Sequence, residues 1–218
     1  MGIQSWLPTI RRSPVIGVIR TPDFALGQPM AKAVAAGGVQ LIEITWNSDC
    51  PTELIRQLRE TLPECLVGAG TLTTREQVLA AIAAGAQFLF TPHVNPILIQ
   101  TAVDHDIPLV AGALTPTEIV TAWQAGAASV KVFPIKAVGG VEYIRCLQGP
   151  LGDIPLIPTG GATVENASSF LQAGAIAVGL AGDLFLPQAV QTKAWDVITK
   201  RAATLMASLA CGRLVQYP

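Results

Sequence analysis

The sequence predicts an α/β protein with the fold of a (β/α)8 TIM barrel, preceded by a short N-terminal helix or arm. Four segments share an Ala-Gly pair followed by a short apolar run, and their glycines, Gly37, Gly85, Gly126 and Gly174, are spaced 48, 41 and 48 residues apart. A second series of four apolar runs falls between these segments. Eight strands alternating with helices over roughly 200 residues are typical of such a barrel.

The eight expected strands are short apolar stretches that contain few charges. In chain order they lie within residues 13–21, 35–45, 65–73, 83–92, 107–115, 124–133, 154–162 and 172–181. Nearly continuous apolar runs indicate parallel strands that are buried on both faces of the sheet. An open doubly wound sheet is the alternative, but the regular repeat and the absence of a G-x-G-x-x-G opening favour the barrel.

Helix signals separate these strands. Each Ala-Gly pair is typical of a helix C-terminus, because glycine accepts the left-handed backbone that ends many helices. Thr73–Glu76 and Thr115–Glu118 fit the S/T-x-x-E capping box, and Pro22 and Pro116 suit the first helical position. The strands are therefore expected to be joined by helices that cover the outside of the barrel.

Length and composition favour one buried domain. Single barrels commonly exceed 200 residues, so residues 1–218 are expected to form one domain. Residues 1–12 should form a short helix or arm outside the barrel, and residues after about Asp183 the last helix and tail. The chain is 50% hydrophobic and 13% charged, yet it lacks the roughly 18 consecutive apolar residues of a membrane span. A net charge of −1 indicates neither nucleic acid nor an anionic membrane as partner.

The cysteines and the His, Asp and Glu residues are spaced neither for disulfides nor for a metal site. Cys50, Cys65, Cys146 and Cys211 form no C-x-x-C pair, so we expect free thiols in a reducing cytoplasm. No clustered set of His, Asp and Glu has metal-ligand spacing. Neither a metal nor a cofactor is therefore expected.

Two charged residues interrupt apolar strands. Lys131 lies between two valines in the sixth expected strand, and Glu43 lies between two isoleucines in the second. Successive side chains of a strand point to opposite faces, so both charges should face the interior if their apolar neighbours face the helices. Interior layers of these barrels draw on alternate strands, so an amine and a carboxylate should meet in one layer.

This pair has a structural and a catalytic interpretation. A buried salt bridge could merely fill the interior, although such pairs contribute little net stability. Alternatively, loss of water favours a neutral amine, which can attack a carbonyl to form a Schiff base while the carboxylate moves protons. The other lysines, Lys32, Lys136, Lys193 and Lys200, have polar neighbours and are expected to be solvated.

Small and hydroxylated residues follow several strands. Thr71 ends the third, residues 158–161 (PTGG) end the seventh, and residues 179–183 follow the eighth. Phosphate sites after strands seven and eight are frequent in this fold, although a plain turn would explain the glycines equally well. Arg20 ends the first strand and either meets a phosphate or carboxylate or is an ordinary surface arginine.

An ordered set of motifs carries a family resemblance. The stretches GGVQLIEIT, VGAGT, FLFTPH, VKVFP and PTGG, in this order, resemble class I aldolases that cleave 2-keto-3-deoxy-6-phosphogluconate (KDPG), also called 4-hydroxy-2-oxoglutarate (KHG) aldolases. The resemblance extends from Val15 to Leu186. It implies a cytoplasmic, homotrimeric, metal-independent lyase of carbohydrate metabolism, in the Entner–Doudoroff route, that acts on a small 2-keto acid.

The resemblance also implies roles for individual residues. Lys131 forms the Schiff base, and Glu43 is the general acid and base. The residues implied to contact substrate are Thr71, Pro92 and Phe133 at the pyruvate end, and Thr159, Gly160 and Gly161 at the end that carries the phosphate.

Two departures leave the substrate open. Asn47 replaces an arginine that gluconate-type members often carry, and Gly182 stands where they often have a serine. Asn47 resembles instead the branch that cleaves the 6-phosphogalactonate analogue. Asp183 would repel a phosphate if its side chain turned inward, but not if it capped a helix. Two other functions remain open: a phosphosugar isomerase or epimerase, and a non-catalytic binding protein.

Overall fold

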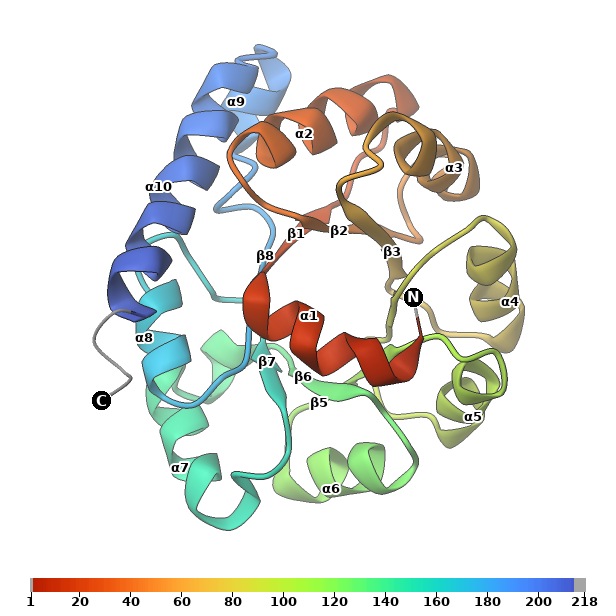
Figure 1. Ribbon diagram of the computed structural model, residues 1–218, viewed down its shortest axis with the longest axis vertical. Helices are drawn as coiled ribbons and strands as arrows, with labels where there is room; N and C mark the ends of the chain where they lie inside the picture. Colours follow the sequence, from red (N-terminus) through yellow and green to blue (C-terminus); the bar gives the residue numbers. More distant parts are fainter. Residues whose placement is uncertain (1, 214–218) are drawn as a thin grey trace.

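The computed structural model describes residues 2–213, and their side chains up to residue 210. Eight parallel strands form one curved sheet (Figure 1). They are β1 (Val15–Ile19), β2 (Leu41–Thr45), β3 (Leu66–Gly70), β4 (Leu89–Phe90), β5 (Leu109–Ala113), β6 (Ser129–Val132), β7 (Leu156–Pro158) and β8 (Val178–Leu180). The hydrogen-bonded order runs from β7 down to β1 and then to β8. A bridge between Thr159 and Gly179 joins the ends of β7 and β8, so the predicted barrel is confirmed.

Helices surround the barrel, as Figure 1 shows. They are α2 (Phe24–Ala36), α3 (Pro51–Thr61), α4 (Arg75–Ala83), α5 (Pro96–Asp104), α6 (Pro116–Gln124), α7 (Val141–Leu151), α8 (Ala167–Gln172), α9 (Pro187–Gln191) and α10 (Trp195–Arg213), with a 3-10 turn η2 (Ile135–Val138). Gly85, Gly126 and Gly174 have positive φ after their helices, as the Ala-Gly repeat predicts. After α2, Gly38 adopts this conformation instead of Gly37.

The apolar side chains divide into two layers, as the alternation along the strands requires. Val130 and Val132 belong to the outer cluster, between the barrel and the helices. Phe88, Phe90 and Ile157 belong to the inner cluster, which fills the barrel. The valines beside Lys131 therefore face the helices, and this orientation leaves the lysine on the interior side of β6.

The N-terminal helix closes one end of the barrel. The turn η1 (Ile3–Ser5) leads into α1 (Trp6–Arg12), which crosses the centre of the ring in Figure 1. Trp6 and Ile10 are fully buried in the inner cluster. The indole N–H of Trp6 donates to the hydroxyl of Ser129, 2.9 Å away at the start of β6. The expected helix is confirmed, but its apolar side seals the N-terminal end of the barrel and does not lie apart from it.

Two helix starts differ from the predicted ones. The capping box before α4 joins Thr74 and Gln77, one residue later than Thr73–Glu76, because the Gln77 side chain reaches back to the backbone of Thr74. Pro22 does not occupy the first helical position, since Asp23 accepts a hydrogen bond from the N–H of Ala25 and caps α2. The predicted box at Thr115–Glu118 is confirmed, with Pro116 first in α6.

The segment after Asp183 contains two helices, α9 and α10, where one was expected. Helix α10 packs against α2, and a side chain on Gly37 would collide with Ala202 of α10. The thiol of Cys211 lies outside the described side chains, and Cys50, Cys65 and Cys146 are free. Among the described residues, no helix is both long and apolar enough to cross a membrane.

Candidate active site

Lys131 lies in a pocket of aromatic rings inside the barrel. It is only 6% exposed, and its register partners are Gly112 on β5 and Ile157 on β7. The Nζ atom lies 4.8 Å from the centre of the Phe133 ring and 5.7 Å from that of Phe90. These rings attract a cation through their faces while they exclude water, so the amine is held in a confined and partly dry space.

Glu43 is the second charged group of the interior. It is 1% exposed, and neither carboxylate oxygen has a hydrogen-bond partner within the protein. Burial raises the pKa of Glu43, while the nearby charges of Lys131 and, to a smaller extent, Arg20 lower it. Since buried polar atoms are almost always paired, an unpaired buried carboxylate points to a partner outside the chain, a water or a ligand.

The geometry does not support a salt bridge between Lys131 and Glu43. Among the described residues, the ion pairs include none between Lys131 and Glu43. Lys131 is nevertheless close enough to lower the pKa of the carboxylate. The two groups therefore share one space without satisfying each other, as a site for a small polar ligand requires.

The ends of β1 and β2 bring Arg20 and Asn47 to the rim of the barrel. Both side chains are exposed. The buried hydroxyl of Ser48 lies 3.1 Å from that of Thr45 and accepts from the N–H of Thr21, so it ties the two strand ends together. The positive charge of Arg20 lowers the pKa of Glu43, so Arg20 acts on the buried carboxylate from the rim.

Thr71 and Pro92 follow β3 and β4. Thr71 is half-buried and has a φ of 60°, an unusual backbone for a residue other than glycine. The backbone of Pro92 packs against Gly112, where no side chain would fit. Because Gly112 pairs with Lys131 in register, Pro92 lies one strand away from the lysine.

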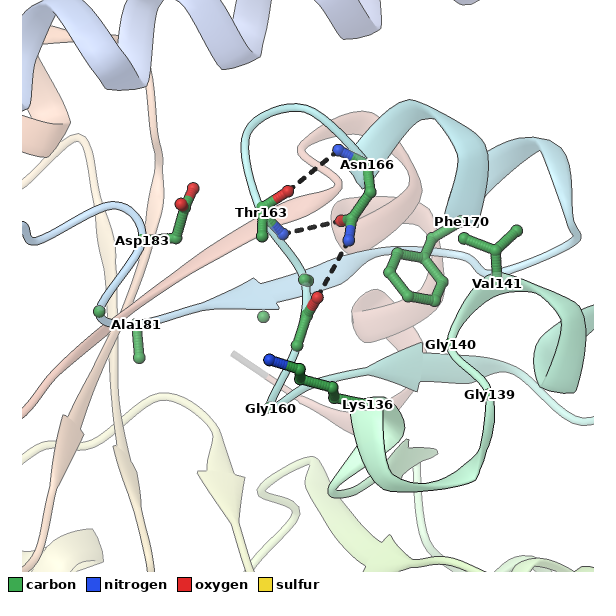
Figure 2. Close-up of a pocket in the computed structure, with 14 residues that line it drawn as sticks. Lys136, Gly139, Gly140, Val141, Gly160, Thr163, Asn166, Phe170, Ala181 and Asp183 are labelled. Carbon is green, nitrogen blue, oxygen red and sulfur yellow. Dashed lines mark hydrogen bonds between the residues drawn. The ribbon is translucent and has the colours of Figure 1, made fainter.

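Beside the lysine lies a hollow of about 580 Å³, drawn in Figure 2. Lys131 and Glu43 do not line it, but the predicted Gly160, Gly161 and Gly182 do. Gly160 separates the hollow from the lysine pocket, since a Cβ there would lie 2.9 Å from ring atoms of Phe133. The hollow, called the side chamber below, thus lies next to the lysine pocket, with Gly160 and the Phe133 ring between them.

Thr159 lies between the chamber and the barrel interior. Its side chain is buried, and its hydroxyl oxygen has no hydrogen-bond partner. A Cβ on Gly179 of β8 would approach that hydroxyl to 2.6 Å, so the absence of a side chain at Gly179 makes room for it. This hydroxyl is, with Glu43, one of the unpaired polar groups of the site.

The side chain of Asp183, for which the sequence allowed two orientations, has defined partners in the structure. Its carboxylate accepts from the N–H of Val164 at 2.8 Å and pairs with the guanidinium of Arg201 at 3.0 Å. The backbone of Asp183 also accepts from Arg201. Asp183 therefore lines the chamber with its carboxylate already paired to Arg201, which also lies 3.8 Å from Glu165.

Sequence reasoning missed three contributions to this region. Phe90 was not singled out, although the alternation in FLFTP places it on the same face as Phe88. Lys136 is exposed, as expected, but its place in the lining of the chamber was not foreseen. The pairing of Arg201 with Asp183 had no local signal, because α10 brings the arginine to the strand-8 turn from 18 residues away.

Metal-binding residues do not gather in this site. Across the part of the chain that the structure describes, no group of three His, Cys, Asp or Glu side chains is placed to hold a metal ion. His93 is exposed beyond β4, and His105 contacts the carbonyl of Thr101 on α5 through Nδ1, 2.8 Å away. The ionisable groups of the barrel interior are therefore Lys131 and Glu43.

Known proteins resemble this chain over almost its whole length. A 2-dehydro-3-deoxy-phosphogluconate aldolase of Dickeya dadantii is 35% identical over 195 residues, which cover 89% of this chain and 91% of that protein. The KDPG aldolase of Legionella pneumophila, solved with pyruvate captured as a covalent carbinolamine, superimposes with a TM-score of 0.84 at 28% identity, covering 91% of this chain and 97% of that one.

A second solved structure, described as native KDPGal, has a TM-score of 0.84 at 30% identity and covers 93% of this chain and 97% of its own. The family model for KDPG and KHG aldolase matches residues 7–201. This match spans the barrel, the interior lysine and glutamate, and the side chamber. The chain therefore belongs to the KDPG and KHG aldolase family and is an aldolase, a lyase of the class I pyruvate type.

Proposed function

We propose that this aldolase works through a Schiff base on Lys131 and cleaves KDPG, KHG or both. The products are pyruvate and an aldehyde, glyceraldehyde 3-phosphate from KDPG and glyoxylate from KHG. The observation that carries the proposal is the unpaired, buried carboxylate of Glu43 beside a lysine enclosed by aromatic rings. The carbinolamine of pyruvate in the Legionella relative supports the same chemistry.

The reaction follows from the positions of the two groups. The neutral amine of Lys131 attacks the C2 ketone, water leaves, and the resulting iminium accepts the electron pair of the C3–C4 bond. Glu43, directly or through a water, takes the proton of the C4 hydroxyl, so that C4 leaves as an aldehyde. Protonation of the remaining enamine at C3, followed by hydrolysis, releases pyruvate and restores the amine.

The other predicted residues would hold the substrate. Thr71, Pro92 and Phe133 surround the pyruvate end, with Arg20 near the carboxylate of Glu43. The unpaired hydroxyl of Thr159 is free to donate to a substrate oxygen. Gly160, Gly161 and Gly182 line the chamber, which accepts the rest of the substrate.

The 6-phosphogalactonate analogue is a second candidate substrate. Asn47 carries no charge at the rim, and the KDPGal structure is 30% identical over most of the chain. By contrast, an isomerase or epimerase needs an acid and a base but no amine, so the enclosed Lys131 has no function in such a reaction. A non-catalytic protein would have no use for an unpaired buried carboxylate, which is costly to keep.

Borohydride trapping tests the Schiff base. Incubation with pyruvate and borohydride should add one reduced pyruvyl group, and peptide mass mapping should place it on Lys131. Lys131→Arg should lose both label and cleavage, because a guanidinium stays protonated. Lys32→Arg, on the exposed face of α2, is the matched control and should keep both. Labelling only at other lysines, or none in the wild type, would refute the proposal.

Two further properties complete the proposal. We expect activity to persist in excess EDTA, because the iminium supplies the electron sink, and a rate restored only by Mg²⁺ or Mn²⁺ would contradict this expectation. We also propose a cytoplasmic homotrimer. Light scattering should then give a mass of about three times 22.8 kDa, and a monomer mass would refute the trimer.

A further inference from the structure

We infer that Lys136 is the cationic residue that binds the phosphate of the substrate, and thus a residue that determines substrate specificity. This inference rests on the proposed function. It assigns a binding role to a lysine that the sequence alone suggested was merely solvated, and it explains how the chamber receives a dianion.

Lys136 is held against the wall of the chamber. It lies in η2, directly after β6, and its backbone N–H donates to the carbonyl of Gly160 at 3.1 Å. A Cβ on Gly161 would lie 2.6 Å from the Cβ of Lys136, so the stem of the lysine packs closely on that glycine. Figure 2 shows the amine directed into the hollow.

The charge of Lys136 is not used by the protein. Within the described residues, the ion pairs do not include it. The other ionisable residue that lines the chamber is Asp183, whose carboxylate already pairs with Arg201 at 3.0 Å. In the described part of the chain, the ammonium of Lys136 is therefore the charged group of the lining that is left without an ion-pair partner, which suits an anion.

The chamber also offers backbone donors. The N–H groups of Gly161 and Gly182 donate no hydrogen bond within residues 2–213. A side chain on Gly182 would meet no atom within 4 Å, so this turn is open to the hollow. An ammonium group together with exposed backbone N–H groups is a recurrent arrangement around phosphate oxygens.

The chamber lies in the right direction from the reacting lysine. Lys131 lies in β6 and Lys136 in the turn η2 that follows it, and the Phe133 ring lies close to both Lys131 and the Gly160 turn. A keto acid bound to Lys131 through C2 would thus extend past Phe133 into the chamber. Its distal group would meet Lys136, whereas its carboxylate would stay near the strand ends on the other side.

Aldol addition, the reverse of the cleavage reaction, isolates the contribution of the substrate phosphate. With pyruvate as donor, we compare glyceraldehyde 3-phosphate with glyceraldehyde as acceptor, and take the ratio of their kcat/KM values. Lys136→Gln should lower this ratio roughly 10- to 100-fold, the size of a charge-assisted hydrogen bond. The loss should fall on glyceraldehyde 3-phosphate, because glyceraldehyde has no phosphate for Lys136 to bind. Lys136→Arg, which keeps the charge, should retain most of the ratio.

Lys32→Gln is the matched control, since it removes an exposed lysine on α2 and should leave the ratio intact. Inorganic phosphate should inhibit the wild type competitively, less so at high salt, and should inhibit Lys136→Gln more weakly. An unchanged ratio together with unchanged inhibition in Lys136→Gln would overturn the inference. A wild type with equal kcat/KM for glyceraldehyde 3-phosphate and glyceraldehyde would overturn it as well.

Borohydride trapping separates this inference from the proposed function. Lys136→Gln should still be labelled by pyruvate at Lys131, because the inference concerns only the distal end of the substrate. If the label persists but the acceptor ratio does not change, the role of Lys136 fails while the Schiff-base proposal stands. If the wild type is not labelled, the proposed function itself fails.

Discussion

The carboxylate of Glu43 occupies the space that a side chain on Gly70 would need. A Cβ built on Gly70, at the end of β3, would overlap Oε1 of Glu43 on the neighbouring β2. The GAGT motif therefore does more than end a strand. Its last glycine makes room for the buried carboxylate and so fixes the position from which Glu43 faces the barrel interior.

Gly70→Ala should displace Glu43. We expect overpacking to cost about 1–3 kcal/mol of stability and kcat to fall at least tenfold, because the carboxylate no longer reaches the reacting proton. Denaturant unfolding and steady-state kinetics measure both quantities. Gly17→Ala on β1 is the control, since its nearest atoms lie 3.6–3.7 Å away and accept a methyl group. Equal effects of the two changes would contradict the steric argument.

Glu43→Gln should bind pyruvate but cleave about 10²–10⁴-fold more slowly, the usual loss for a positioned acid or base. Its stability should respond to pH in a defined way. Burial raises the pKa of Glu43, so the folded wild type loses stability as pH rises from about 4.5 to that raised value. The difference in Tm between Glu43→Gln and the wild type should therefore increase in favour of Glu43→Gln as pH rises over this interval. Near-normal turnover with lower stability would instead favour the salt-bridge interpretation.

Arg20→Met should move the acid limb of the rate profile. The positive charge of Arg20 lowers the pKa of Glu43, so its removal should shift the acid limb of kcat/KM to higher pH. Arg12→Met, a change of another exposed arginine in the N-terminal helix, should leave the limb in place. A limb that does not move in Arg20→Met would show that Arg20 acts only on substrate binding.

Asn47→Arg combined with Gly182→Ser should shift preference toward KDPG. An arginine fork at the rim and a hydroxyl in the chamber add charge-assisted hydrogen bonds, worth about 1–3 kcal/mol in kcat/KM relative to KHG. The measurement compares KDPG, KHG and the galactonate epimer in wild type, single and double variants. The prediction is wrong if the wild type already strongly prefers KDPG and neither change alters the ratio.

Trp6→Ala should destabilise the fold without altering the chemistry. The indole is fully buried, its ring centre lies 5.6 Å from that of Phe88, and it donates to Ser129, so its loss should cost about 3–5 kcal/mol. Denaturant unfolding measures this cost, and KM at a permissive temperature should stay close to the wild-type value. Trp123→Ala on α6 is the control, because Trp123 is 37% exposed. A small effect of Trp6→Ala would mean that α1 does not close the barrel.

Features encoded over a few residues could be predicted from the sequence. The Ala-Gly repeat and the apolar runs locate the strands, because chain reversal and strand burial each leave a local pattern. Alternation along β2 and β6 places Glu43 and Lys131 inside the barrel, since the side-chain direction follows from strand geometry alone. The choice between Thr73 and Thr74 as a cap failed, because both positions offer a hydroxyl and the Gln77 side chain accepts from both backbone N–H groups. The hydroxyl of Thr74 is the one that accepts from the backbone N–H of Gln77.

Other features depend on which surfaces the folded chain brings together. The position of Trp6 at the end of the barrel depends on a hydrogen bond to Ser129, more than a hundred residues away in the sequence. Asp183 has an ion-pair partner at the chamber only because α10 returns Arg201 to the strand-8 turn. Lys136 lines that chamber only because η2 packs on the Gly160 turn. Local sequence sets side-chain direction along a strand or helix, whereas long-range packing decides which charges meet and which remain free to bind a substrate.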